Sequence, residues 1–197
     1  MGQGFDLGNV GSSPEITSIH IKLVAGAAIN YQKTMIRVQF WDTFGSATSP
    51  FFSNPAGSLQ TFTTGPLTTA GATAYTFSLD FTTPIPLTGL TGRGLTVNWQ
   101  SDPTGVGTFA NDGNLTTALR TTGYANIAVG ANSNPSSGYY RNASSETDFN
   151  FLSGSARSLS GVTNGGLVFD LTMTVVPEPT TFALAGLAMF AMRRRTA

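Results

Sequence analysis

The residues that could do acid–base chemistry in this sequence are few and widely spaced. His20 is the only histidine, and it lies with Lys22 on the polar side of a stretch of alternating apolar and polar residues. Asp80 and Asp170 occupy polar positions in two similar stretches, where they could be neighbours. Glycosidase chemistry needs two carboxyl groups that face each other across a cleft. Solvated surface positions account for all of these side chains, so we expect no catalytic site.

Two other acids, Asp102 and Asp112, lie in one glycine-rich segment, where carboxylate oxygens could bind Ca²⁺. The segment lacks the dense acidic spacing and the closing glutamate of a hand-type calcium loop. Asp-Pro and Asp-Gly are also ordinary turn pairs. We therefore expect a turn here, with no metal ion and no cofactor.

A third candidate is the run formed by Tyr139, Tyr140 and Arg141. Aromatic rings beside polar groups can form a surface on which a sugar stacks. The sequence leaves open the alternative that one tyrosine packs inward while its neighbour covers an edge of the sheet. The run therefore supports a carbohydrate-binding module only as an alternative function.

The composition narrows the class of protein. Charged residues make up 10% of the 197 residues, and the net charge is zero. Nucleic-acid binding leaves a basic footprint, so we expect no nucleic-acid partner. The absence of cysteine excludes disulfides, thiolate metal sites and cysteine nucleophiles. The length suits a single domain that is held together by its hydrophobic core.

The elements that position these residues should be β-strands, because the body alternates apolar and polar residues with a period of two. The clearest stretches are 16–24, 34–41, 74–82, 93–100 and 166–176, and weaker ones are 59–63, 115–121, 124–129 and 138–142. Turn-forming clusters separate them at 49–57, 84–94, 101–114 and 130–138, and 25–32 is predicted to be a loop.

This pattern predicts an all-β fold, an antiparallel β-sandwich of jelly-roll-like topology over residues 1–176. Successive side chains of a strand point to opposite faces, so the apolar faces should share one aromatic-rich core. The residues expected to point inward are Ile19, Ile21, Leu23, Ile36, Val38, Phe40, Tyr75, Phe77, Leu79, Phe81, Leu95, Val97, Trp99, Leu167, Phe169, Leu171, Met173 and Val175.

Residues 176–197 differ in character from this body. Pro177 and Pro179 flank Glu178, and prolines interrupt both sheets and helices. An uncharged apolar run follows over 180–192, and Arg193, Arg194 and Arg195 close it. A hydrophobic run that ends in arginines is the layout of a membrane-stop signal, with the arginines on the cytoplasmic side.

A helix over 180–192 would be short for a transmembrane span. It would rise about 20 Å, against a hydrocarbon core of about 30 Å. Arginine snorkelling and local thinning can close part of this gap. The alternative is a terminal helix buried against the domain, with the arginines at the negative end of its dipole.

Val176, Pro177, Glu178 and Pro179, with the apolar run and the arginines, resemble the PEP-CTERM sorting signal of bacteria that make an exosortase. The resemblance implies an exported protein that its tail holds transiently in the inner membrane. It also implies processing near Pro177–Pro179 by the exosortase, a membrane cysteine peptidase. Proteins of this kind are associated with extracellular polysaccharide and biofilm matrix.

Export requires a leader, and residues 1–13 show neither a basic n-region nor an apolar h-region. We therefore expect the start of the protein to lie upstream of Met1. The leading functional hypothesis is a non-catalytic cell-surface or extracellular-matrix protein, with residues 177–197 as its sorting signal. A carbohydrate-binding module is the alternative, and an exported hydrolase comes third.

Overall fold

The computed structural model describes residues 2–7, 14–44, 52–88, 92–110, 114–117, 119–120, 131–132, 138–141, 155–158, 166–167 and 169–175. The regular structure of this part of the chain is β-strand, and every described strand pair is antiparallel. The strands are β1 (Gly2–Asp6), β2 (Pro14–Ala25), β3 (Ile29–Tyr31), β4 (Lys33–Phe44), β5 (Phe52–Thr64), β6 (Leu67–Thr69), β7 (Thr73–Pro86), β8 (Arg93–Asp102), β9 (Leu115–Thr117), β10 (Leu119–Arg120), β11 (Ala131–Asn132), β12 (Gly138–Arg141), β13 (Ser155–Ser158), β14 (Gly166–Leu167) and β15 (Phe169–Val175).

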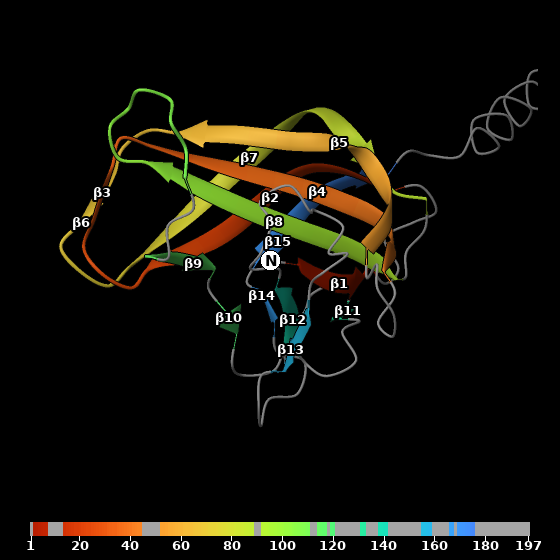
Figure 1. The fold of residues 1–197 in the computed structure, drawn as a ribbon. Helices are drawn as coiled ribbons and strands as arrows, with labels where there is room; N and C mark the ends of the chain where they lie inside the picture. Colours follow the sequence, from red (N-terminus) through yellow and green to blue (C-terminus); the bar gives the residue numbers. More distant parts are fainter. Residues whose placement is uncertain are drawn as a thin grey trace, which may run out of the picture.

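Two larger sheets carry most of these strands (Figure 1). The first, here called the large sheet, has the order β13-β12-β1-β8-β4-β5, with β11 paired to β1. The second, the small sheet, has the order β15-β2-β7, with β9 paired to β2. β3 pairs with β6, and β10 with β14, in two short ladders.

One long hairpin supplies strands to both larger sheets. Its first arm runs through β2, β3 and β4, and its second arm returns through β5, β6 and β7. The pairing stays in step from Ile19–Leu79 to Val38–Gln60. Each residue further along the first arm is paired with one residue earlier in the second arm. β3 and β6 form the bend, at the left of Figure 1. The hairpin therefore folds over, and its two halves belong to different sheets.

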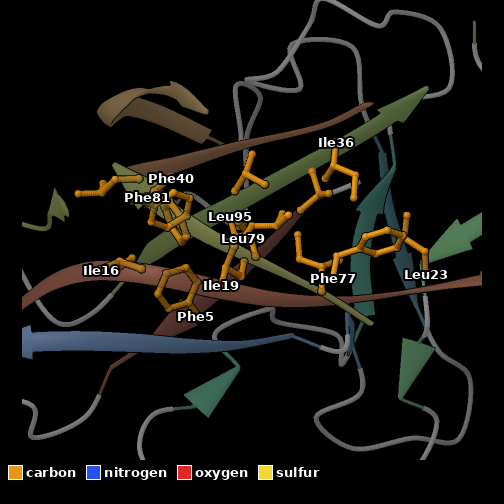
Figure 2. Close-up of a cluster of buried hydrophobic side chains, with 14 of the residues drawn as sticks. Phe5, Ile16, Ile19, Leu23, Ile36, Phe40, Phe77, Leu79, Phe81 and Leu95 are labelled. Atoms are coloured by element: carbon orange, nitrogen blue, oxygen red, sulfur yellow. The ribbon is translucent and has the colours of Figure 1, made fainter. Parts of the chain in front are cut away.

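The hydrophobic core lies where the two sheets face each other (Figure 2). Phe40 of the large sheet meets Phe81 of the small sheet edge to face, with ring centroids 5.8 Å apart. Ile19, Leu23 and Leu95 are fully buried. Each such side chain contributes about 1.5–3 kcal/mol by leaving water. The inward-facing positions predicted from alternation are confirmed for the described side chains, with Tyr75, Trp99, Phe169, Leu171 and Met173 partly buried at the margin of the core.

A separate aromatic cluster covers glycines on the other face of the large sheet. Phe52 is fully buried, and its ring centroid lies 6.3 Å from that of Trp41 and 5.4 Å from that of Phe44. A Cβ at Gly94 would come within 2.5 Å of the Phe52 ring, and one at Gly4 would overlap the Phe44 ring. Glycine is therefore required at these positions so that the rings can lie on the backbone of β1 and β8.

Gln39 fills a bulge near the far end of the hairpin. Residues 57–59 of β5 lie opposite the single residue Gln39, because Val38 pairs with Gln60 and Phe40 with Ala56. The side-chain amide of Gln39 donates to the carbonyl oxygens of Phe40 at 2.8 Å, Gly57 at 3.3 Å and Ala56 at 3.4 Å. These bonds tie the Gln39 side chain to the backbone on both sides of the bulge.

The all-β, antiparallel prediction is confirmed, as are four of the five clearest strands. The fifth, 166–176, contains β14 and β15, which belong to different ladders, and residues 168 and 176 lie outside the described residues. The described pairings do not establish a jelly-roll topology, and 124–129 and the tail helix lie outside the described residues. The predicted loop at 25–32 contains β3, and β5 begins inside the predicted turn at 49–57. Pro55 is tolerated in β5 because, among the described strands, β5 is an edge of the large sheet.

Candidate functional site

Asp170, His20 and Ser78 form one row across the outer face of the small sheet. His20 in β2 is the pairing partner of Asp170 on one side and of Ser78 on the other. The Nδ1 atom of His20 lies 2.6 Å from Oδ1 of Asp170. Carboxylate, imidazole and hydroxyl stand in the order of a hydrolase triad. This row is therefore the arrangement in the described structure that most resembles a nucleophilic site.

The surroundings of the row do not favour catalysis. The side chains of His20 and Asp170 are 40% and 73% exposed, and Ser78 is also exposed. Among the hydrogen bonds of the described residues, none joins His20 to Ser78. Triad chemistry depends on oxyanion donors in a site from which water is excluded. The exposed position expected for His20 is confirmed, and Asp170 is its partner.

Asp80 and Asp170 share this outer face without being neighbours. Asp80 pairs with Ser18, whereas Asp170 pairs with His20, and β2 lies between the two acidic strands. Adjacent strands are about 4.8 Å apart, so the strands that carry the two acids are about 10 Å apart. The neighbouring arrangement considered from the sequence is therefore wrong, because the sequence does not reveal which strand separates them.

Asp102 ends β8 and organises the loop that follows. Its Oδ1 accepts hydrogen bonds from the Thr104 amide at 2.9 Å, the Thr104 hydroxyl at 2.8 Å and the Gly105 amide at 2.8 Å. Its Oδ2 accepts from the Gly107 amide at 2.7 Å. Burial acts to raise the pKa of Asp102, but the Gly107 amide, the Thr104 hydroxyl and the Gly105 and Thr104 amides outweigh it, so the pKa lies below its ordinary value.

These four hydrogen bonds make Asp102 a turn-forming group. This agrees with the turn expected at 101–114, and Asp112 lies outside the described residues. Within the part of the chain that the structure describes, no group of three His, Cys, Asp or Glu side chains is placed to hold a metal ion.

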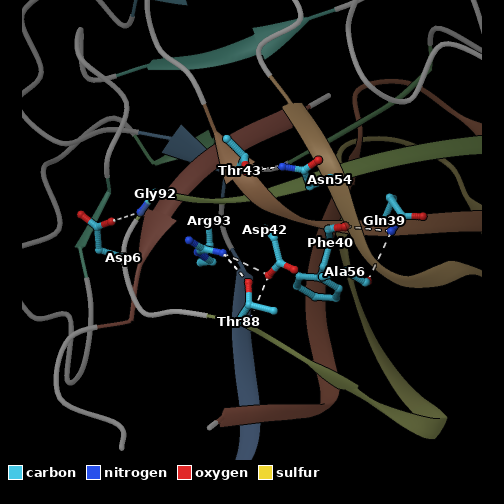
Figure 3. A network of polar contacts seen from close by, with 10 residues as sticks. All are labelled: Asp6, Gln39, Phe40, Asp42, Thr43, Asn54, Ala56, Thr88, Gly92 and Arg93. Atoms are coloured by element: carbon cyan, nitrogen blue, oxygen red, sulfur yellow. Dashed lines mark hydrogen bonds and ion pairs between the residues drawn. The ribbon is translucent and has the colours of Figure 1, made fainter. Parts of the chain in front are cut away.

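A largely enclosed ion pair joins Asp42 to Arg93 at one end of the large sheet (Figure 3). Asp42 Oδ1 accepts from Arg93 Nη1 at 3.0 Å and from the Thr88 amide at 3.1 Å. Nearby, Asp6 Oδ1 accepts from the Gly92 amide at 2.6 Å. These contacts connect the segment between β7 and β8 to two strands. Thr88 is bound to Asp42 of β4, and Gly92 is bound to Asp6, the last residue of β1. Their role is structural, since each acceptor is used to hold backbone or Arg93.

Tyr139, Tyr140 and Arg141 belong to β12, which confirms the weaker strand predicted at 138–142. Tyr139 pairs with Arg157 of β13, and Tyr140 pairs with Ala156 of β13 and with Gly2 of β1. The run that was considered as a sugar-stacking surface therefore forms a strand of the large sheet, which lies between β1 and β13.

The predicted sorting residues Val176–Pro179 and Arg193–Arg195 lie outside the described residues. What the structure places is the strand that leads to them: β15 pairs with β2 as far as Val175, which is the partner of Pro14. A search of the described residues for a helix long and apolar enough to cross a membrane finds none.

Comparison with known proteins identifies the tail. A family model described as the PEP-CTERM protein-sorting motif matches residues 175–195. No curated protein and no solved structure matches the chain. The chain therefore carries a PEP-CTERM sorting motif behind an all-β body, as the resemblance predicted. The motif supports export, transient anchoring through the C-terminal region and processing by an exosortase.

Sequence reasoning missed the partners of several polar residues. Nothing local in the sequence pairs Asp170 with His20, or Arg93 with Asp42, since each pair is far apart along the chain. Alternation placed His20 and Asp170 on polar faces, but register and strand order, which only the fold supplies, decide which polar groups meet.

Proposed function

We propose that this protein is an exported, non-catalytic component of the cell surface or extracellular matrix, sorted through its C-terminal signal. The observation that carries the proposal is the PEP-CTERM motif at residues 175–195. The all-β body is the part that remains after the signal has been removed. Its folded hairpin, which passes from one sheet to the other, supports a jelly-roll-like topology for that body.

The tail would act in two parts. The apolar run at 180–192 forms a short transmembrane helix, and Arg193–Arg195 hold its end in the cytoplasm. Each arginine costs about 2.5–3.5 kcal/mol at the centre of a membrane, so three together block passage of the end. Pro177 and Pro179 keep the segment around Glu178 extended at the outer surface, where the exosortase binds it.

The anchor suits a temporary state. A helix of about 20 Å is shorter than the roughly 30 Å hydrocarbon core, so it holds the protein less firmly than a full-length span. Cleavage near Pro177–Pro179 releases the body from the inner membrane to the cell surface or the matrix.

An extracellular polysaccharide of the biofilm matrix is the partner that we propose for the released body. The outer face of the small sheet supports this, because it presents exposed neutral hydroxyl groups at Thr76, Ser78, Thr172 and Thr174. A glycan array with the processed protein tests it. Saturable binding that is lost in Tyr139→Ala or Tyr140→Ala would instead favour the carbohydrate-binding alternative, with β12 as its site.

The sorting step is tested with the full chain fused behind a secretory signal peptide in hosts with and without an exosortase. We expect the chain to remain in the inner-membrane fraction without the enzyme and to leave it when the enzyme is present. Glu178→Ala should reduce release, whereas Glu146→Ala, the same change at a position outside the motif, should not. Equal release in both hosts would contradict exosortase-dependent sorting.

A further inference from the structure

The sorting motif begins within the last strand that the structure describes. The match starts at residue 175, and β15 ends at Val175. At no more than about 3.6 Å per residue, Glu178 lies within about 11 Å of the last paired residue along the chain. A peptide held in extended form donates and accepts main-chain hydrogen bonds over several residues. The last pairs of β15 therefore involve backbone next to the segment that the sorting peptidase has to bind.

The ladder between β15 and β2 is interrupted just before this end. Thr172 pairs with Ser18 but Met173 pairs with Ile16, so Thr17 is an extra residue in β2. The Thr17 hydroxyl donates to the Thr172 carbonyl oxygen at 3.1 Å. The bulge divides the ladder into a longer part, before Met173, and a short end of three pairs, from Met173 to Val175.

The final pair of this short end is weak. Pro14, the partner of Val175, has no backbone N–H to donate. Its carbonyl oxygen accepts a hydrogen bond from the Leu87 amide at 3.0 Å, on the opposite side of β2. Among the described strands, β15 pairs along one edge only, with β2. Separation of Met173–Val175 therefore breaks few ladder bonds, and Thr174 is already exposed. Its main cost is the withdrawal of Met173, which is partly buried at the margin of the core.

The part of β15 before the bulge is held more firmly. Phe169 and Leu171 pack against the core, and the Phe169 ring lies 5.9 Å from that of Phe5. Asp170 contacts His20 at 2.6 Å. The body can therefore keep this part of the strand in place while the end beyond the bulge separates.

We propose that Met173–Val175 is a releasable end of β15, which leaves β2 so that the membrane-embedded sorting peptidase can bind the adjoining motif. The bulge at Thr17 sets where the separation stops. The inference rests on the proposed function, since it needs the exosortase as partner. It adds that the enzyme acts on a form of the body that is locally open.

A disulfide across the short end tests this directly, because the chain has no cysteine of its own. Glu15 and Thr174 are pairing partners, so Glu15→Cys/Thr174→Cys would join β2 to β15 beyond the bulge. The Cα atoms of antiparallel partners are about 4.5–5.5 Å apart, which is within the range of a disulfide. His20→Cys/Asp170→Cys is the matched control, since it joins the same two strands before the bulge.

The full chain of each variant, exported behind a signal peptide, is accumulated in a host whose exosortase is not yet induced. Alkylation then confirms that the disulfide has formed, the enzyme is induced, and mass spectrometry follows loss of the tail. We expect the bond between positions 15 and 174 to slow processing at least about tenfold, because the end can no longer open. The control bond, between positions 20 and 170, should leave the rate of tail loss within about twofold of the wild-type rate.

One further variant helps to separate the possible outcomes. A six-residue Gly/Ser spacer inserted between Val175 and Val176 should restore processing of the Glu15→Cys/Thr174→Cys variant with its disulfide intact. Processing of that variant at the wild-type rate would overturn the releasable end while leaving the proposed function in place. Equal blockage by both disulfides would also overturn it, because the separation would then not stop at the bulge. If the wild-type chain itself is not processed, the proposed function fails instead.

Discussion

Arg93 donates a hydrogen bond to Asp42 at 3.0 Å, with the two side chains only 15% and 18% exposed. The same Asp42 oxygen accepts from the Thr88 amide. Asp42→Ala should therefore lower the free energy of unfolding by about 1–3 kcal/mol, since it removes the carboxylate that accepts from Arg93 and from a backbone amide. Urea denaturation measures this.

The exposed pair His20–Asp170 is the control for that measurement. Asp170→Ala also removes a side-chain contact, between Oδ1 and the His20 Nδ1 atom at 2.6 Å, but these side chains are solvent-exposed. It should change the free energy of unfolding by no more than about 1 kcal/mol. Equal losses from the two variants would mean that enclosure of Asp42 and Arg93 has no energetic consequence.

The second prediction concerns the stability effect of replacing a glycine that lies under the aromatic cluster. A Cβ at Gly94 would lie 2.5 Å from the fully buried Phe52 ring, so Gly94→Ala should destabilise the protein by about 1–3 kcal/mol. Gly71→Ala adds the same atom where nothing lies within 4 Å, and it should change stability by less than about 0.5 kcal/mol. Thermal unfolding of the two variants side by side distinguishes a packing effect from a general effect of replacing glycine.

These glycines also explain why β1 was not among the predicted strands. Residues 2–6 contain Gly2 and Gly4, yet β1 lies inside the large sheet, between β8 and β12. Glycine is unfavourable in a strand on propensity alone. It is needed here because Phe44 and Phe52, which come from distant strands, lie on this backbone. No local pattern in the sequence contains that information.

What the sequence predicted well depended on local regularity. Alternation gave the inward positions of β2 and β7 correctly, for example Ile19 and Leu79, because one face of each strand is buried. The sorting motif is a contiguous run and needs no fold to be recognised. The pairings His20–Asp170 and Val175–Pro14 could not be predicted, since they depend on strand order and on the bulge at Thr17.

Asp102 makes stability depend on pH in the acidic range. Its pKa in the folded protein lies below the ordinary value of 3.8, so the ionised carboxylate stabilises the fold above that value. This contribution is lost as the pH falls through the folded-state pKa. Asp102→Asn should therefore be less stable than the wild type near neutral pH, because an NH₂ donor would face the Gly107 amide. The difference should shrink as the pH falls below 3.8.

Denaturation curves of both proteins from neutral pH down to the acid limit measure this difference. A gap between wild type and Asp102→Asn that stays constant with pH would contradict a lowered pKa of Asp102. In that case the loop would depend on the shape of the side chain and not on its charge.

We test for hydrolase activity at the row formed by Asp170, His20 and Ser78, which most resembles a catalytic site in the described structure. The exposed His20 and Asp170 side chains should not activate Ser78, so we expect the purified protein to turn over neither activated esters nor polysaccharides. Turnover by the wild type that is lost in both Ser78→Ala and His20→Ala, with the fold intact by circular dichroism, would contradict the non-catalytic assignment.

The central claim, that the tail is a removable sorting signal, is tested most directly by the mass of the exported protein. In an exosortase-bearing host, intact-mass spectrometry of the full chain, exported behind a signal peptide, should show a loss of about 2 kDa from the C-terminus, estimated from the length of the segment after Val176. Peptide mapping should then place the new C-terminus near Pro177–Pro179. An exported protein that still ends at Ala197 would contradict the account.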